Sequence, residues 1–172
     1  MNFKRLFQHL LTPDWMVRFS FPSLSLSKIE KAIAASEKTH KGELRFAVEM
    51  GLDLPALLNS QTARQRATEV FSQLRVWDTE QNCGVLIYVQ LLDRTVEILA
   101  DRGIAACVPP QEWNAVCHRM EQAYKKGEFE SGSLCAIEEI GTRLAKHFPR
   151  EAGVSDAGSA KRNELSDKPI VL

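Results

Sequence analysis

The sequence predicts an α/β fold, a small three-layer α/β/α sandwich around a mixed sheet. Alternating apolar residues in 43–50 and a continuous apolar stretch in 85–89 are both typical of strands. Between them, residues 63–74 have the period of a helix, so this crossover makes the two strands parallel. A short connection then leads to another strand at 95–100. Because it is too short for a crossover, strands 85–89 and 95–100 should form an antiparallel hairpin.

The first helix of the predicted domain precedes strand 43–50. Ser27 and Glu30 have the spacing of a capping box, which places the start of this helix at Ser27. Gly42 ends it. In the strand that follows, apolar residues alternate with more polar ones, so we expect one face of this strand to be less apolar than the other.

Strand 85–89 is apolar at every position, which is typical of a strand covered on both faces. We therefore place it in the centre, between strands 43–50 and 95–100. Two more helical patterns follow at 113–124 and 134–148, which gives enough helices to cover both faces of the sheet.

The chain of 172 residues has the length of one domain with short appendages. We predict an N-terminal amphipathic helix and linker at 1–24, the α/β domain at 25–149, and a disordered tail at 150–172, where Gly, Ser, Ala and charged residues dominate. The apolar end of this tail, 169–172, has an edge strand as its alternative.

The charge balance and the N-terminus limit the partners. Lys plus Arg and Asp plus Glu number 22 each, so no overall positive field attracts a nucleic acid. We find neither a signal peptide nor a stretch of roughly 20 apolar residues that could cross a bilayer, and we predict a cytoplasmic location. The amphipathic pattern in 1–11 predicts a helix that docks on its own domain or, alternatively, on a membrane surface or a protein partner.

The predicted topology brings three oxygen-bearing side chains to one end of the sheet. Glu43 begins the first strand, Asn82 precedes the second, and Asp101 follows the third, which runs in the opposite direction. Glu37, in the last turn of the first helix, and Asp78, in the loop before the second strand, approach the same end. Carboxylate and amide oxygens are hard ligands, so the cluster is a candidate site for Ca²⁺ or Mg²⁺.

The opposite end of the sheet offers a rival site. Asp93 and Arg94 lie in the hairpin turn, and Glu49 and Asp53 follow the first strand. Ligands of open α/β sheets usually bind at the carboxyl ends of the parallel strands, which is this end. For both sites the alternative is that these polar residues only form turns and strand ends.

Motifs of common enzyme classes are missing from the sequence. It contains neither GxGxxG nor GxxxxGK[ST], and neither HExxH nor GxSxG. No clear nucleophile is visible, so the sequence leaves open whether the chain is an enzyme.

Several short blocks, in this order, resemble the TPM-domain family of bacterial proteins and a plant thylakoid-lumen protein: Glu37, His40–Phe46, Asn82–Tyr88, Leu92–Arg94 and Asp101–Ile104. The resemblance implies an α/β/α sandwich, divalent-cation binding in some members, and the acid phosphatase activity of plant members. The family positions that look matched here are Glu43, Asn82, Gly84, Asp93 and Asp101. Many bacterial relatives also carry a signal peptide, a transmembrane helix and a Gly-rich tail, none of which this sequence shows.

Two hypotheses follow. In the first, the domain binds a divalent cation and hydrolyses phosphomonoesters weakly. Glu43 and Asp101 would be metal ligands, Asn82 a carbonyl ligand or an orienting group, and Arg102 a phosphate contact. In the second, the chain is a non-enzymatic module that contacts a protein or a membrane through residues 1–11 or 169–172.

Overall fold

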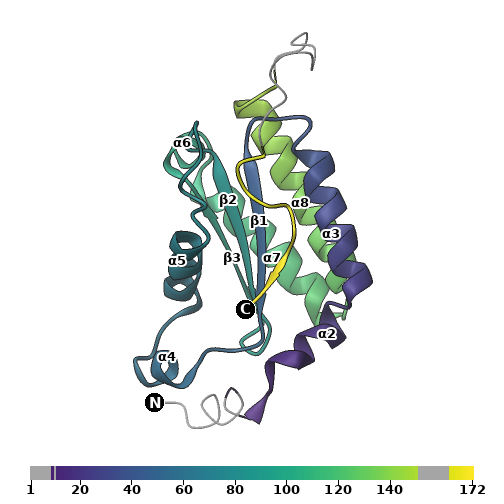
Figure 1. Cartoon of the computed structure of the whole chain (residues 1–172), viewed down its shortest axis with the longest axis vertical. Helices are drawn as coiled ribbons and strands as arrows, with labels where there is room; N and C mark the ends of the chain where they lie inside the picture. The colour runs from purple at the N-terminus through teal and green to yellow at the C-terminus, as the bar shows by residue number, and fades with distance from the viewer. Residues whose placement is uncertain (1–8, 10, 151–162) are drawn as a thin grey trace.

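The computed structural model describes residue 9, residues 11–150 and residues 163–172 (Figure 1). A four-stranded sheet has the order β3-β2-β1-β4, with β1 at Glu43–Glu49, β2 at Gly84–Gln90, β3 at Thr95–Ala100 and β4 at Ile170–Val171. The helices are η1 (Asp14–Met16), α2 (Val17–Ser20), α3 (Ser23–Ser36), α4 (Leu54–Leu58), α5 (Ala63–Gln73), α6 (Arg102–Ala105), α7 (Pro110–Lys125) and α8 (Phe129–His147).

The predicted strand order and directions are confirmed. β1 pairs in parallel with β2, with Glu43 opposite Gly84, and β2 pairs antiparallel with β3, with Val85 opposite Ala100. β2 therefore lies inside the sheet, as its apolar sequence predicts, and all seven of its residues are buried.

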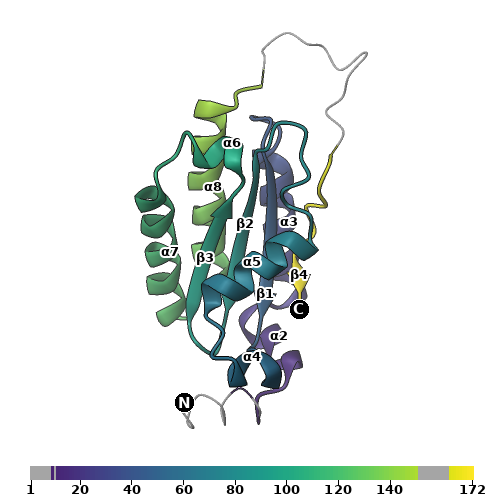
Figure 2. The same ribbon diagram turned by 90° about the vertical axis from the view of Figure 1, so that its left-hand side faces the viewer.

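Helices cover both faces of the sheet, so the predicted three-layer α/β/α sandwich is confirmed. Helices α3, α7 and α8 lie on one face and α5 on the other (Figures 1 and 2). Alternate residues of each strand enter different cores, as their period of two requires. Phe46 and Ile87 pack in the core under α3, α7 and α8, whereas Ala47 and Tyr88 pack under α5.

The N-terminal boundary of the domain differs from the prediction. Helix α3 begins at Ser23 after Pro22, four residues before the predicted start, so the capping box at Ser27 is wrong. Proline has no backbone N–H and clashes with a preceding helical turn, so it is tolerated only at the start of a helix. Pro22 therefore sets the N-terminal boundary of α3. Val17 and Phe21 are fully buried in the main core, so the domain begins before residue 25. The predicted helix 1–11 lies outside the described residues except for residues 9 and 11.

The C-terminal prediction is wrong for residues 163–172. β4 adds to β1 as a parallel edge strand, with Ala47 opposite Ile170, and Leu165 joins the core under α5. The edge strand considered for 169–172 is therefore present, whereas residues 151–162 lie outside the described part. Because this segment and α5 cover the more polar face of β1, all seven residues of that strand are buried, including Glu43 and Arg45.

None of the helices within the described residues is long and apolar enough to cross a membrane.

Candidate functional site

The register of the sheet places the predicted cluster residues at one end. Glu43 opens β1 opposite Gly84, the first residue of β2. Asp101 directly follows β3, and its backbone N–H donates to the carbonyl oxygen of Gly84 at 2.8 Å. The positions of Glu43, Asn82 and Asp101 are thus brought together by strand pairing, at the end of the molecule where α6 lies (Figure 1).

The two carboxylate oxygens of Asp101 differ in their hydrogen bonding. Its Oδ1 accepts a hydrogen bond from the backbone N–H of Arg102 at 2.7 Å, at the start of α6. Its Oδ2 is buried and has no hydrogen-bond partner among the described residues, and Asp101 as a whole is only 8% exposed. A buried carboxylate oxygen without a donor is costly, by roughly 1–3 kcal/mol, unless a ligand or water satisfies it.

The side chain of Asn82 orients the guanidinium group of Arg102. Its backbone has a φ of 51°, a left-handed conformation that asparagine tolerates better than most residues. Its Oδ1 accepts from Nε of Arg102 at 2.8 Å, and its backbone oxygen accepts from the N–H of Gly103 at 2.9 Å. The amide oxygen predicted as a metal ligand therefore already holds the guanidinium of Arg102.

Gly84 is required by close packing at the same end. A Cβ on Gly84 would stand 2.0 Å from the carbonyl oxygen of Val76, which is backbone and cannot rotate away. A side chain here would push the loop before β2 away from the sheet, together with Asn82.

Glu43 and Glu37 are buried, and their carboxylates accept hydrogen bonds from backbone N–H groups. Oε2 of Glu43 accepts from the N–H of Leu165 at 3.3 Å, so the C-terminal segment closes over this carboxylate. Oε1 of Glu37 accepts from the N–H of Leu44 at 2.7 Å and fixes the start of β1. Burial lowers the pKa of the nearby Arg45, an effect that the charges of Asp167 and Glu37 partly offset.

Asp78 and Arg102 are exposed at this end, Asp78 in the loop before β2. Within the described ranges, no three His, Cys, Asp or Glu side chains gather into a group that could hold a metal ion by themselves. A cation at this end would therefore need amide or backbone oxygens, or water, besides Asp101 and Glu43.

At the opposite end, Asp93 is joined to the N-terminal segment. Nε2 of the buried His9 lies 3.1 Å from Oδ1 of Asp93, and Nδ1 of His9 lies 2.9 Å from the backbone N of Leu52. Because Nδ1 accepts the Leu52 N–H, the proton of the neutral ring sits on Nε2 and points to Asp93. Both ring nitrogens are used, so His9 links chain segments and has no lone pair left for a substrate. Arg94 is exposed in the hairpin turn.

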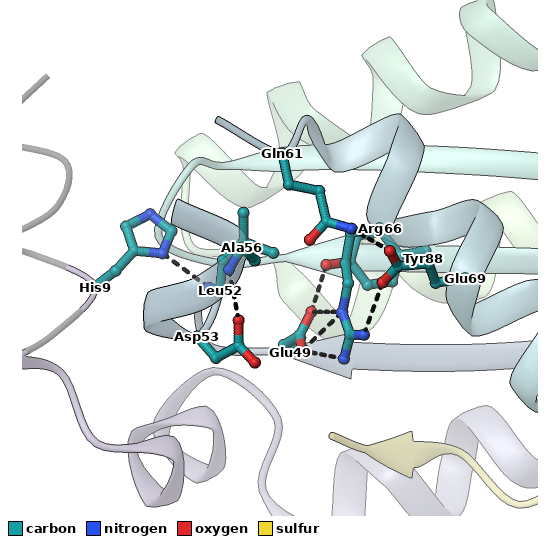
Figure 3. A network of polar contacts seen from close by, with 9 residues as sticks. All are labelled: His9, Glu49, Leu52, Asp53, Ala56, Gln61, Arg66, Glu69 and Tyr88. Carbon is teal, nitrogen blue, oxygen red and sulfur yellow. Dashed lines mark hydrogen bonds and ion pairs between the residues drawn. The ribbon is translucent and has the colours of Figure 1, made fainter. Parts of the chain in front are cut away.

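A cleft of about 1020 Å³ lies between this N-terminal segment and helices α4 and α5. Its lining includes the buried carboxylate of Glu49. This carboxylate accepts hydrogen bonds from Nε of Arg66 at 3.1 Å, from Nη2 of Arg66 at 2.8 Å and from the hydroxyl of Tyr88 at 2.5 Å (Figure 3). Nη1 of Arg66 also reaches Glu69 at 3.3 Å. Burial and the charge of Glu49 raise the pKa of Tyr88. The hydrogen bonds that Arg66 donates to Glu49 raise the pKa of Arg66.

The charges of the cleft do not favour a phosphate. Among the described residues, its lining carries the carboxylates of Glu49, Asp53 and Glu69 and the guanidinium of Arg66, which is already bound by two of them. Sequence reasoning placed Glu49 and Asp53 at this end but missed Arg66 and Tyr88. Tyr88 lies two residues before the end of β2, on the same face of the sheet as Glu49. The alternation of side chains along the two strands could therefore have predicted that Tyr88 and Glu49 share a face.

The chain thus forms a small α/β/α domain with a mixed sheet and with polar side chains at both ends of that sheet. The sequence profile of the TPM domain matches residues 21–143, and the chain belongs to this family.

Solved structures agree with this assignment. The NMR structure of the BA42 protein from the psychrophilic bacterium Bizionia argentinensis is similar, with 29% identity and a TM-score of 0.71 over 86% of this chain and 92% of that chain. The N-terminal domain of a P. gingivalis protein, at 14% identity, has a TM-score of 0.61 over 81% of this chain and 94% of that one, and shows the fold alone. No curated protein matches the sequence.

Proposed function

We propose that this TPM domain binds a divalent cation, Ca²⁺ or Mg²⁺, at the sheet end near Asp101. The proposal rests on one observation above all, the buried Oδ2 of Asp101 that lacks a hydrogen-bond donor among the described residues. A cation would satisfy this oxygen and offset the charge of the neighbouring buried Glu43. Hard carboxylate oxygens are the ligands these two metals prefer.

The same end supports phosphomonoester hydrolysis as the proposed activity. Nε of Arg102 is held by Asn82, which leaves the Nη groups of this exposed side chain for a phosphate oxygen. A bound cation would supply the polarisation of a phosphate oxygen or of a water molecule. The chain's own residues would bind and orient the ester, and a water molecule would be the attacking nucleophile.

The activity is tested with p-nitrophenyl phosphate, with added Ca²⁺ or Mg²⁺ and with a chelator. We expect metal-dependent turnover that Asp101→Asn reduces by about tenfold or more and that Asp53→Asn, the same change at the opposite end, leaves unchanged. Turnover that the chelator does not affect, or that Asp101→Asn retains, would contradict the proposed activity.

A further inference from the structure

Several exposed apolar side chains belong to elements at the end of the molecule opposite the proposed cation site. Leu11, Trp15 and Phe19 on the N-terminal segment are 63%, 61% and 75% exposed, and Leu54 and Leu58 of α4 are also exposed. We call these five residues the apolar end surface. Helices α2 and α4 lie at the same end in both views (Figures 1 and 2). His9 contacts Leu52 just before α4, so the two segments are neighbours.

The local structure turns two aromatic rings outward. Val17 and Phe21 are fully buried in the main core and fix the segment against the domain. Trp15 and Phe19 alternate with them and point away, with ring centroids 5.7 Å apart. The segment therefore presents two exposed aromatic rings in contact with each other, and exposed apolar groups of this kind mark interaction sites.

The chemistry of the patch fits a lipid bilayer better than a peptide. Of the five residues, only Leu54 lines the hollow at this end, and that hollow has carboxylates at its floor, unlike the apolar groove that binds a helical peptide. Tryptophan, phenylalanine and leucine are the side chains that enter the interfacial layer of a membrane, which requires no matching groove.

Two exposed basic residues belong to the same end of the molecule. Arg18 is exposed between Trp15 and Phe19, and Arg94 is exposed in the hairpin turn at the same end. A long arginine side chain can lay its stem along apolar groups while its guanidinium reaches a headgroup.

We propose that the apolar end surface docks on a lipid bilayer, with Trp15 and Phe19 inserted into the interface and Arg18 and Arg94 beside the headgroups. Docked in this way, the domain would hold its Asp101 end away from the bilayer. The proposal is independent of cation binding at that end.

The test is co-sedimentation of the full chain with vesicles of phosphatidylcholine, with and without phosphatidylglycerol. We expect binding, stronger with the anionic lipid, and a loss of at least about tenfold in the partition coefficient for Trp15→Ser/Phe19→Ser. Trp77→Ser is the matched control, because Trp77 is 51% exposed but lies before β2, at the other end. Circular dichroism of each variant checks that it is folded.

A second readout follows insertion directly. In Trp77→Phe, tryptophan emission comes from Trp15 and the buried Trp113, so brominated lipids should quench it in proportion to the inserted Trp15. Absence of vesicle binding, equal binding by Trp15→Ser/Phe19→Ser, or an equal loss in Trp77→Ser would overturn the proposal.

Discussion

The network around Glu49 should be the most sensitive electrostatic feature of the domain. Glu49 is 7% exposed and accepts both the guanidinium of Arg66, whose side chain is 21% exposed, and the hydroxyl of Tyr88. Replacing Glu49 by Gln keeps the shape of the side chain but leaves the half-buried Arg66 with only the more exposed Glu69 as a counterion, at 3.3 Å. Breaking a fully buried pair costs about 3–5 kcal/mol, and the partial exposure of Arg66 together with its remaining ion pair to Glu69 argues for the lower limit, about 3 kcal/mol.

Urea denaturation measures this loss. With a slope of about 2 kcal/mol per molar urea, the midpoint of Glu49→Gln should fall by about 1.5 M. Tyr88→Phe removes one charge-assisted hydrogen bond, for about 1.5–3 kcal/mol, and the double variant should lose less than the sum because both changes act on one carboxylate.

The control is the same substitution at a surface pair. Glu139 binds Arg119 through two hydrogen bonds, but the side chains are 33% and 54% exposed, so Glu139→Gln should cost less than about 1 kcal/mol. If Glu49→Gln cost no more than Glu139→Gln, or if its loss and that of Tyr88→Phe were additive, the reasoning about this network would be refuted.

Three further predictions concern stability. Gly84→Ala should destabilise the fold by several kcal/mol in urea, since its Cβ would meet the carbonyl oxygen of Val76; a loss below about 1 kcal/mol would contradict the packing argument. Leu165→Ala should cost about 2–4 kcal/mol, because Leu165 is buried under α5; wild-type stability would mean that the C-terminal segment is not docked. Burial raises the pKa of the Cys117 thiol to about 12. Above pH 9 the unfolded chain therefore releases a proton that the folded chain keeps, so stability should fall with rising pH. The fall should be less steep in Cys117→Ala, by at most about 1.4 kcal/mol per pH unit, and equal slopes in urea titrations would contradict this effect.

Much of the sheet could be predicted from the sequence because its signals are local. The period of two in β1, the apolar run of β2 and the short turn before β3 determine the strand order and directions. The burial of Glu43 and Arg45 could not be predicted, because the segment that covers them lies more than 100 residues further along the chain. The start of α3 was missed because a capping pattern inside the helix outweighed Pro22.

The candidate site shows the same division. The position of Asp101 beside Gly84 follows from topology alone, and so does that of Asn82. The partners of their side chains depend on rotamers and on close packing, which no pattern shows. The sequence therefore could not predict that Arg102 would occupy the amide oxygen of Asn82, or that Oδ2 of Asp101 would have no donor within the described part of the chain.

The most direct test of the proposed cation site is a titration of the full chain with Ca²⁺ and with Mg²⁺, followed by amide chemical shifts. We expect saturable shifts at Asp101, Arg102 and the residues around Asn82, and their loss in Asp101→Asn but not in Asp93→Asn. Shifts centred on the Asp93 end, or shifts that persist unchanged in Asp101→Asn, would contradict it.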